Sequence, residues 1–216
     1  MASRRGAAAS AARASSRTPL PPPALGKGIK NPAWLPPVRA STRLEPGQLT
    51  TKFVTVPAEE AQRVLLGMIR FVVDIDADTT PIVVWQREGD ELWVDVSATT
   101  LTCADGLVQV GVRVGCDQLR VPLTMRVPLG VGTPKSPTGL LLTTVQRLDG
   151  PDLVTSRWSD AITAFAWEAV IELARHVCAA LGDDKSGLPL VPGALAATEK
   201  ALLIQPMSRH DLSAVG

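Results

Sequence analysis

The amino-acid sequence predicts an α+β fold in which an antiparallel meander sheet packs on a long C-terminal helix, preceded by a disordered basic arm. Three observations predict this architecture. Apolar and polar side chains alternate within residues 107–128, which is typical of half-buried strands. Residues 159–181 carry apolar side chains at helical spacing. Residues 1–44 are rich in Ala, Ser and Pro and contain eight Arg and Lys residues but no acid.

Charge divides the chain into parts. The whole sequence has 22 bases and 21 acids, and because eight bases lie before residue 45, the remainder has 14 bases and 21 acids. This division excludes a uniformly basic nucleic-acid coat. We predict a disordered arm over 1–44, an α+β domain over 45–182, and a segment over 183–216 made of a loop, a short helix and a tail.

Composition excludes several functions. Aromatic residues make up 4% of the chain and Tyr is absent, which argues against a stacking platform for sugars or single-stranded nucleic acid. The apolar runs are shorter than the ~18 residues that a membrane span needs. Three scattered cysteines are too few for a disulfide scaffold and favour a reducing compartment, so we expect a cytoplasmic protein.

The arm over 1–44 cannot bury enough apolar surface to offset its ordering entropy, so we expect disorder in isolation. Its composition leaves several interpretations open. It fits an organelle transit peptide, or a tail whose bases, such as Arg4 and Arg5, contact nucleic acid or anionic lipid. It also fits an arm that docks on a partner protein through Trp34 and Leu35, or one whose Trp34 packs on its own domain.

The folded part begins with a short strand over 51–56 and a helix over 57–72. Pro57 suits the first helical position, and Glu59 and Glu60 follow where the helix dipole favours acids. Residues 69–75 also fit a strand, so the pattern leaves the end of this helix open.

Strands are then predicted over 82–87, 92–96, 107–115, 119–128 and 140–147. In the two firmest strands, the side chains expected to face inward run from Val108 to Val114 and from Leu119 to Val127. Pro122 and Pro128 lack amide donors, which predicts that the strand over 119–128 lies at an edge or contains a bulge.

The last predicted helix has Ser159 as N-cap and Gly182 as its C-terminal stop. Trp167 and Ile171 belong to a second apolar row that widens its apolar arc, so we expect cover on more than one side. The sheet can supply one side, and the other can be the first helix, residues 194–204, a second subunit or a bound apolar ligand. The order of elements over 49–182 is similar to that of the helix-grip proteins. That resemblance implies a curved sheet wrapped around the long helix, often enclosing an apolar cavity.

Our first hypothesis is a non-enzymatic interaction or assembly subunit. It would bind partner proteins, or further copies of itself, through the arm and through the apolar helix face. The residues expected to bind the partner are Arg4, Arg5, Trp34, Leu35, Trp167 and Ile171.

The alternative follows from the helix-grip resemblance, which implies a binding protein or carrier for an apolar small molecule. The residues expected to line its cavity are Val110, Val112, Leu123, Met125 and Phe165.

A third hypothesis is Mg²⁺-dependent phosphoryl transfer. Asp76, Asp78 and Thr80 match the DxDxT nucleophile motif of haloacid-dehalogenase-type phosphatases, although antiparallel hairpins rather than helical crossovers follow them. Neither a catalytic triad nor a phosphate-binding loop is placed by spacing, and no His or Cys residues have paired ligand spacing. We therefore expect no catalytic residues, no cofactor and no metal.

Overall fold

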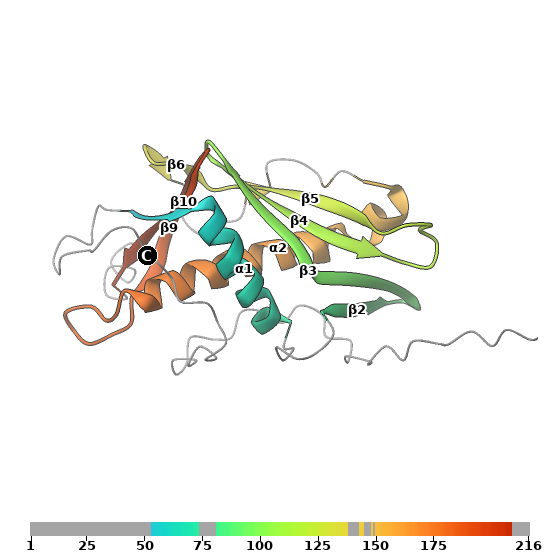
Figure 1. Cartoon of the computed structure of the whole chain (residues 1–216), viewed down its shortest axis with the longest axis horizontal. Coiled ribbons are helices and arrows are strands. Elements are labelled where there is room, and N and C mark those ends of the chain that lie inside the picture. The colour runs from blue at the N-terminus through green and yellow to red at the C-terminus, as the bar shows by residue number, and fades with distance from the viewer. Residues whose placement is uncertain (1–52, 74–80, 138–142, 145–147, 149, 209–216) are drawn as a thin grey trace, which may run out of the picture.

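A computed structural model describes residues 53–73, 81–137, 143–144, 148 and 150–208 of the chain. Antiparallel sheets and two helices form its described part, with the longer helix near the C-terminal end, and this confirms the predicted α+β class. The two helices lie on one face of the larger sheet, and the smaller sheet lies beside the C-terminal end of the long helix (Figure 1).

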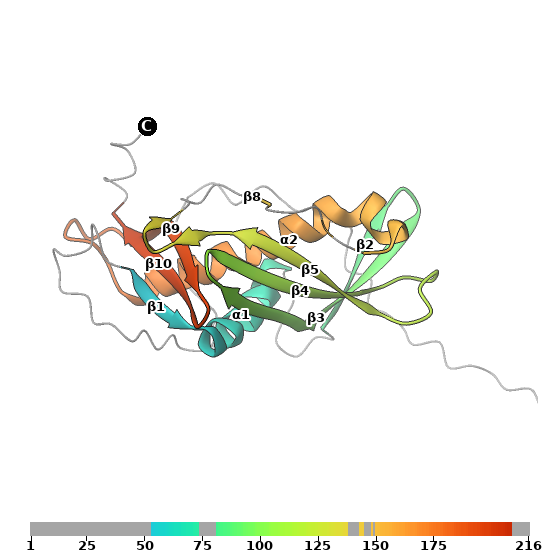
Figure 2. The same cartoon turned by 90° about the horizontal axis from the view of Figure 1, so that it is seen from above.

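The larger sheet is the predicted meander. Its strand order is β2-β3-β4-β5-β8, and all its neighbours are antiparallel. Seen from above, β3, β4 and β5 cross over the two helices (Figure 2). The strands are β2 (Ile82–Arg87), β3 (Asp90–Ala104), β4 (Leu107–Gly115), β5 (Leu123–Gly130) and β8 (Thr143–Thr144).

Two of these strands differ from the prediction. β3 continues to Ala104 because a register shift between Asp95 and Thr100 lets it bend and pair with β4 along both of its halves. β5 begins only at Leu123, and Val121 is 69% exposed, so the expectation that Val121 belongs to the inward row is wrong. Leu119 precedes the strand and still packs against the core, on the side expected. The remainder of that row, at Met125 and Val127, is buried as predicted.

The first helix, α1 (Ala58–Val72), follows β1 (Val54–Pro57) directly, as expected, but Pro57 ends the strand instead of opening the helix. The long helix α2 (Asp152–Ala180) begins well before Ser159, which lies inside it; the expected N-cap is therefore wrong. Pro151 stands at the start of α2 without a side-chain capping hydrogen bond. Gly182 follows the helix with φ +94°, a conformation that glycine adopts without strain, and confirms the predicted stop.

The segment after α2 corrects the prediction of a short helix. β9 (Val191–Thr198) and β10 (Ala201–Met207) form a hairpin, and β10 pairs with β1 to give a three-stranded sheet of order β1-β10-β9. A small hairpin of β6 (Gly132–Thr133) and β7 (Ser136–Pro137) completes the elements. Pairing and burial thus outweigh the helix propensity of the alanines in β9.

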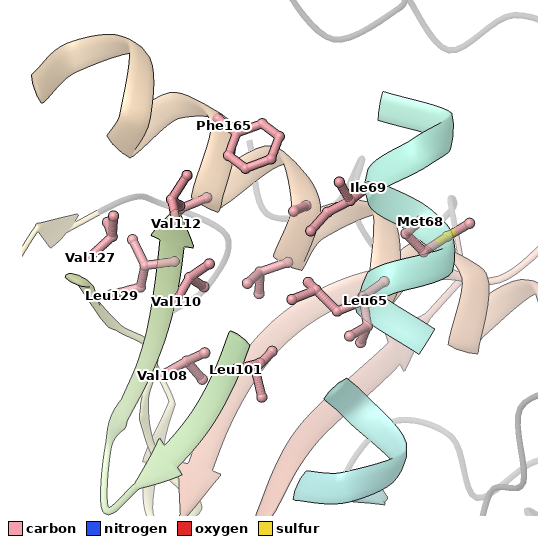
Figure 3. Packing of buried hydrophobic residues seen from close by; sticks show 14 of the residues in the cluster. Leu65, Met68, Ile69, Leu101, Val108, Val110, Val112, Val127, Leu129 and Phe165 are labelled. Atoms are coloured by element: carbon pink, nitrogen blue, oxygen red, sulfur yellow. The ribbon is translucent and has the colours of Figure 1, made fainter. Parts of the chain in front are cut away.

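One apolar core joins these parts. Leu65 and Ile69 of α1 approach it from one side, and Val110 and Val112 of β4 approach it from the other (Figure 3). Leu202 and Ile204 of β10 and Leu173 of α2 belong to the same cluster. The folded body therefore extends through Met207, beyond the boundary expected at residue 182.

Candidate protein-interaction surface

Two sets of predicted residues lie outside the described part of the chain. These are the arm residues Arg4, Arg5, Trp34 and Leu35, and the acidic motif formed by Asp76, Asp78 and Thr80. Their proposed roles stay predictions.

The apolar rows of α2 are covered by the chain itself. None of the residues from Ala161 to Cys178 is exposed, and α1, both hairpin strands β9 and β10, and the larger sheet contact this helix. Trp167 and Ile171 are half-buried and pack against the central core. Among the expected covers, the first helix and residues 194–204 are the ones that contact α2, so the apolar helix face expected to bind a partner is covered by the chain itself.

The row expected to line a ligand cavity lies within the central core. Val110, Val112, Met125 and Phe165 are buried there among residues of both helices, and Leu123 is half-buried against the same cluster. Their position between sheet and helix is the one predicted, and close apolar neighbours surround them.

Two exposed apolar side chains, Ile82 and Trp93, lie on the face of the larger sheet that turns away from the helices. Trp93 is 42% exposed and Ile82 is 50% exposed, whereas Leu92 and Val94, the neighbours of Trp93 in the chain, are fully buried. Because successive side chains of a strand point to opposite faces, Trp93 lies on the outer face. Val84 stands opposite Trp93 in β2, and Gly115 stands opposite it in β4.

Gly115 leaves room for this arrangement. A Cβ atom added at residue 115 would lie 3.7 Å from Cε3 of Trp93 and 3.7 Å from Cγ of Pro122, so both rings flank the bare backbone of this glycine. We call this surface the outer apolar patch and define it by its members: Ile82, Val84, Trp93 and Pro122.

Charged side chains border the outer apolar patch. On one side of it, Asp95 stands opposite Ile82 and Arg113 stands opposite Asp95. Glu91, which accepts a hydrogen bond from Nε2 of Gln86 at 2.7 Å, lies on the other side. An apolar centre with a polar rim is the usual composition of a protein-protein interface.

Contacts with α2 hold the β2–β3 hairpin, and thus the patch, in place. Nη1 and Nη2 of Arg87 donate hydrogen bonds to Oδ1 and Oδ2 of Asp160 at 2.9 and 3.0 Å, and Nη1 also donates to the main-chain oxygen of Arg157. The Arg87 guanidinium carbon lies 5.5 Å from the centre of the Trp158 ring. The hydrogen bond from Arg87 lowers the pKa of the Asp160 carboxyl, and Asp160 in turn raises the pKa of Arg87.

We call the contacts of Arg87 with Asp160, Arg157 and Trp158 of α2 the clamp, and aromatic packing adds to it. The Trp85 ring lies 5.6 Å from that of Phe165, edge to face, and 6.5 Å from that of Trp158. Beside the clamp, an ion pair of Arg157 with Asp90 borders a shallow hollow of about 170 Å³. The hollow is lined by Asp90, Glu91, Cys116, Gln118, Leu153, Ser156, Arg157 and Trp158.

Two thiols lie in apolar surroundings. Burial raises the pKa of Cys178 to about 12 and that of Cys103 to about 11, so both stay protonated at neutral pH. Across the described ranges, no three His, Cys, Asp or Glu side chains lie close enough together to hold a metal ion.

Sequence reasoning missed Trp93 although a signal was present. The strand expected over 92–96 alternates in polarity, and this places Trp93 and Asp95 together on its polar side. A tryptophan on the polar side of a strand is an indication of an exposed aromatic side chain.

No helix in the described part of the chain is both long and apolar enough to cross a membrane. Comparison with known proteins finds no family model, no curated protein and no solved structure that matches this chain.

Proposed function

We propose that this protein is a non-enzymatic interaction subunit that binds a partner protein through the outer apolar patch, with the basic arm over 1–44 as a second docking segment. The observation that carries the proposal is Trp93. Its ring is held beside Gly115 on a strand whose neighbouring side chains are fully buried, yet it is 42% exposed. Trp is enriched among the residues that dominate binding energy at interfaces.

The position of the patch supports this proposal. Its strands are fixed from behind by the core and by the clamp between Arg87 and α2, so the patch is a rigid surface and needs little ordering on binding. It replaces the helix face of the first hypothesis, because Trp167 and Ile171 pack on the central core.

The arm contributes charge to the proposal. It has eight bases and no acid, whereas the remainder of the chain has an excess of seven acids. An arm of this charge favours association with an acidic surface on the partner, and its effect should weaken as salt is raised.

The test compares complexes isolated gently from the native cell with three forms of the chain: wild type, Trp93→Glu and Thr102→Glu. Thr102 is an exposed residue on the same sheet face, at the far end of β3, so it is a matched control. We expect wild type and Thr102→Glu to retain the same partner and Trp93→Glu to lose most of it, with equal thermal unfolding of all three. Equal retention by all three would contradict the patch as the docking surface.

A deletion of residues 1–44 tests the arm separately. We expect weaker retention of the partner at low salt and a smaller difference from the full chain at high salt. Retention that does not change at either salt concentration would remove the arm from the proposal.

A further inference from the structure

β2 is an edge strand with an unused pairing side. It forms one end of the larger sheet, and in Figure 1 it is the lower border of that sheet. Within the described ranges, the hydrogen bonds of residues 82–86 all go to β3. Its outer main-chain donors and acceptors are therefore available to another strand.

The centre of β2 lacks the protection that other strand edges of this fold carry, although Pro81 precedes the strand and Arg87 ends it. Proteins block edge pairing with charges, prolines and short strands. β5, which within the described residues pairs with β8 only at Leu129 and Gly130, contains Arg126 and Pro128 along its remaining length. β9 contains Pro192, and β1 is four residues long and ends at Pro57. By contrast, Ile82–Gln86 contains no charge, no proline and no glycine.

From this contrast we infer that the chain forms a two-fold dimer in which β2 pairs antiparallel with β2 of a second copy, centred on Val84. The sequence of the strand selects this register. Centring on Val84 places Ile82 opposite Gln86 and Val83 opposite Trp85, so every paired residue is uncharged. Centring one residue earlier, on Val83, would place Gln86 opposite residue 80, which lies before β2. Centring one residue later would bring Arg87, which is bound to Asp160, into the pairing.

The same register makes the two patches continuous. Because Val84 stands opposite Trp93, the row across the joined sheets becomes Trp93, Val84, Val84 of the second copy and Trp93 of the second copy. Three strand spacings separate the two tryptophans, which places their Cα atoms about 14 Å apart on one face. This inference rests on the proposed function in one respect, since the dimer doubles the surface offered to the partner protein.

Sedimentation velocity of the full chain over a range of concentrations measures the association. Since the paired segment is short, we expect a reversible dimer rather than a permanent one. Val84→Lys puts two like charges directly opposite each other and should weaken the dimer by roughly tenfold or more. Thr102→Lys, the matched control on the outer face, should leave it unchanged. A monomer at all concentrations, or equal dimerisation of wild type and Val84→Lys, would overturn the inference.

Disulfide trapping tests the register. Val84→Cys should form a covalent dimer under mild oxidation, because the two introduced thiols face each other across the axis. Gln86→Cys should not, because residue 86 faces Ile82 of the second copy. A covalent dimer from Gln86→Cys with none from Val84→Cys would overturn the proposed pairing. These outcomes are separable from the proposed function: a monomer that still loses its partner on Trp93→Glu would refute the dimer alone.

Discussion

The contact of β2 with α2 through Arg87 allows a quantitative prediction. Replacing Arg87 by Ala removes three interactions at once: the paired hydrogen bonds to Asp160, the hydrogen bond to the main-chain oxygen of Arg157, and the contact with the Trp158 ring. The Asp160 side chain is 68% exposed, so solvent screening reduces its ion pair to ~0.5 kcal/mol. The ring contact adds about 0.5–1 kcal/mol, and the main-chain hydrogen bond adds about 1 kcal/mol.

Arg87→Ala should therefore lower the free energy of unfolding by about 2 kcal/mol, and Asp160→Ala by only ~0.5 kcal/mol. Urea unfolding followed by circular dichroism measures both values, and the double variant gives the coupling between the two side chains. Arg175→Ala is the control, since Arg175 pairs with Glu172 within α2 itself. If Arg87→Ala and Asp160→Ala cost the same, with a coupling equal to the whole loss, then the contacts of Arg87 with Trp158 and Arg157 contribute nothing and the reasoning is refuted.

The pH dependence of the same pair has a definite sign. The hydrogen bond from Arg87 lowers the pKa of Asp160 in the folded state below its ordinary value of 3.8. A carboxyl with a lowered folded pKa contributes stability above its unfolded pKa, and that contribution is lost as pH falls through the folded value. Wild type should thus be more stable than Asp160→Asn at pH 7, with the difference disappearing below pH 3.8. A difference that stays constant on acidification would contradict the pairing.

Two further predictions concern the core. Leu173 of α2 is fully buried, so Leu173→Ala should lower the free energy of unfolding by about 2–5 kcal/mol, as measured by urea titration. A loss under about 1 kcal/mol would mean that α2 is less well packed than described. A pKa of about 12 leaves Cys178 with roughly one thiolate in ten thousand molecules at pH 8, so iodoacetamide should modify it only after unfolding. Rapid labelling of Cys178 in the folded chain, read by mass spectrometry, would contradict its burial.

The periodicity of apolar residues along the sequence predicted those helices and strands that have one buried and one exposed face. α1 and β4 follow from periodicity, because one face of each meets the core and the other does not. Tertiary contacts decide β9 and β10: the alanines of β9 favour a helix in isolation, but pairing with β10 and packing against α2 make this segment a strand. The start of α2 at Asp152 could not be predicted from a capping residue, because Pro151 precedes it and provides no capping side chain.

The interaction surface was predictable in part. Alternation along β3 assigns Trp93 to the outer side, but its place between Val84 and Gly115 depends on pairing with strands on both sides, and the register of β4 is set by contacts distant in the sequence. For α2, the number of apolar residues suggests more apolar surface than the larger sheet alone can cover. The cover that removes this surplus comes in part from β9 and β10, which the sequence pattern assigned to a helix.

The most direct measurement of the central claim is hydroxyl-radical footprinting of Trp93 in the isolated chain and in the complex drawn gently from its native cell. Met207, which is half-buried in the smaller sheet, is the internal control. We expect oxidation of Trp93 to fall severalfold in the complex while oxidation of Met207 is unchanged. Equal oxidation of Trp93 in both samples, with protection elsewhere on the chain, would show that a partner binds at a different surface.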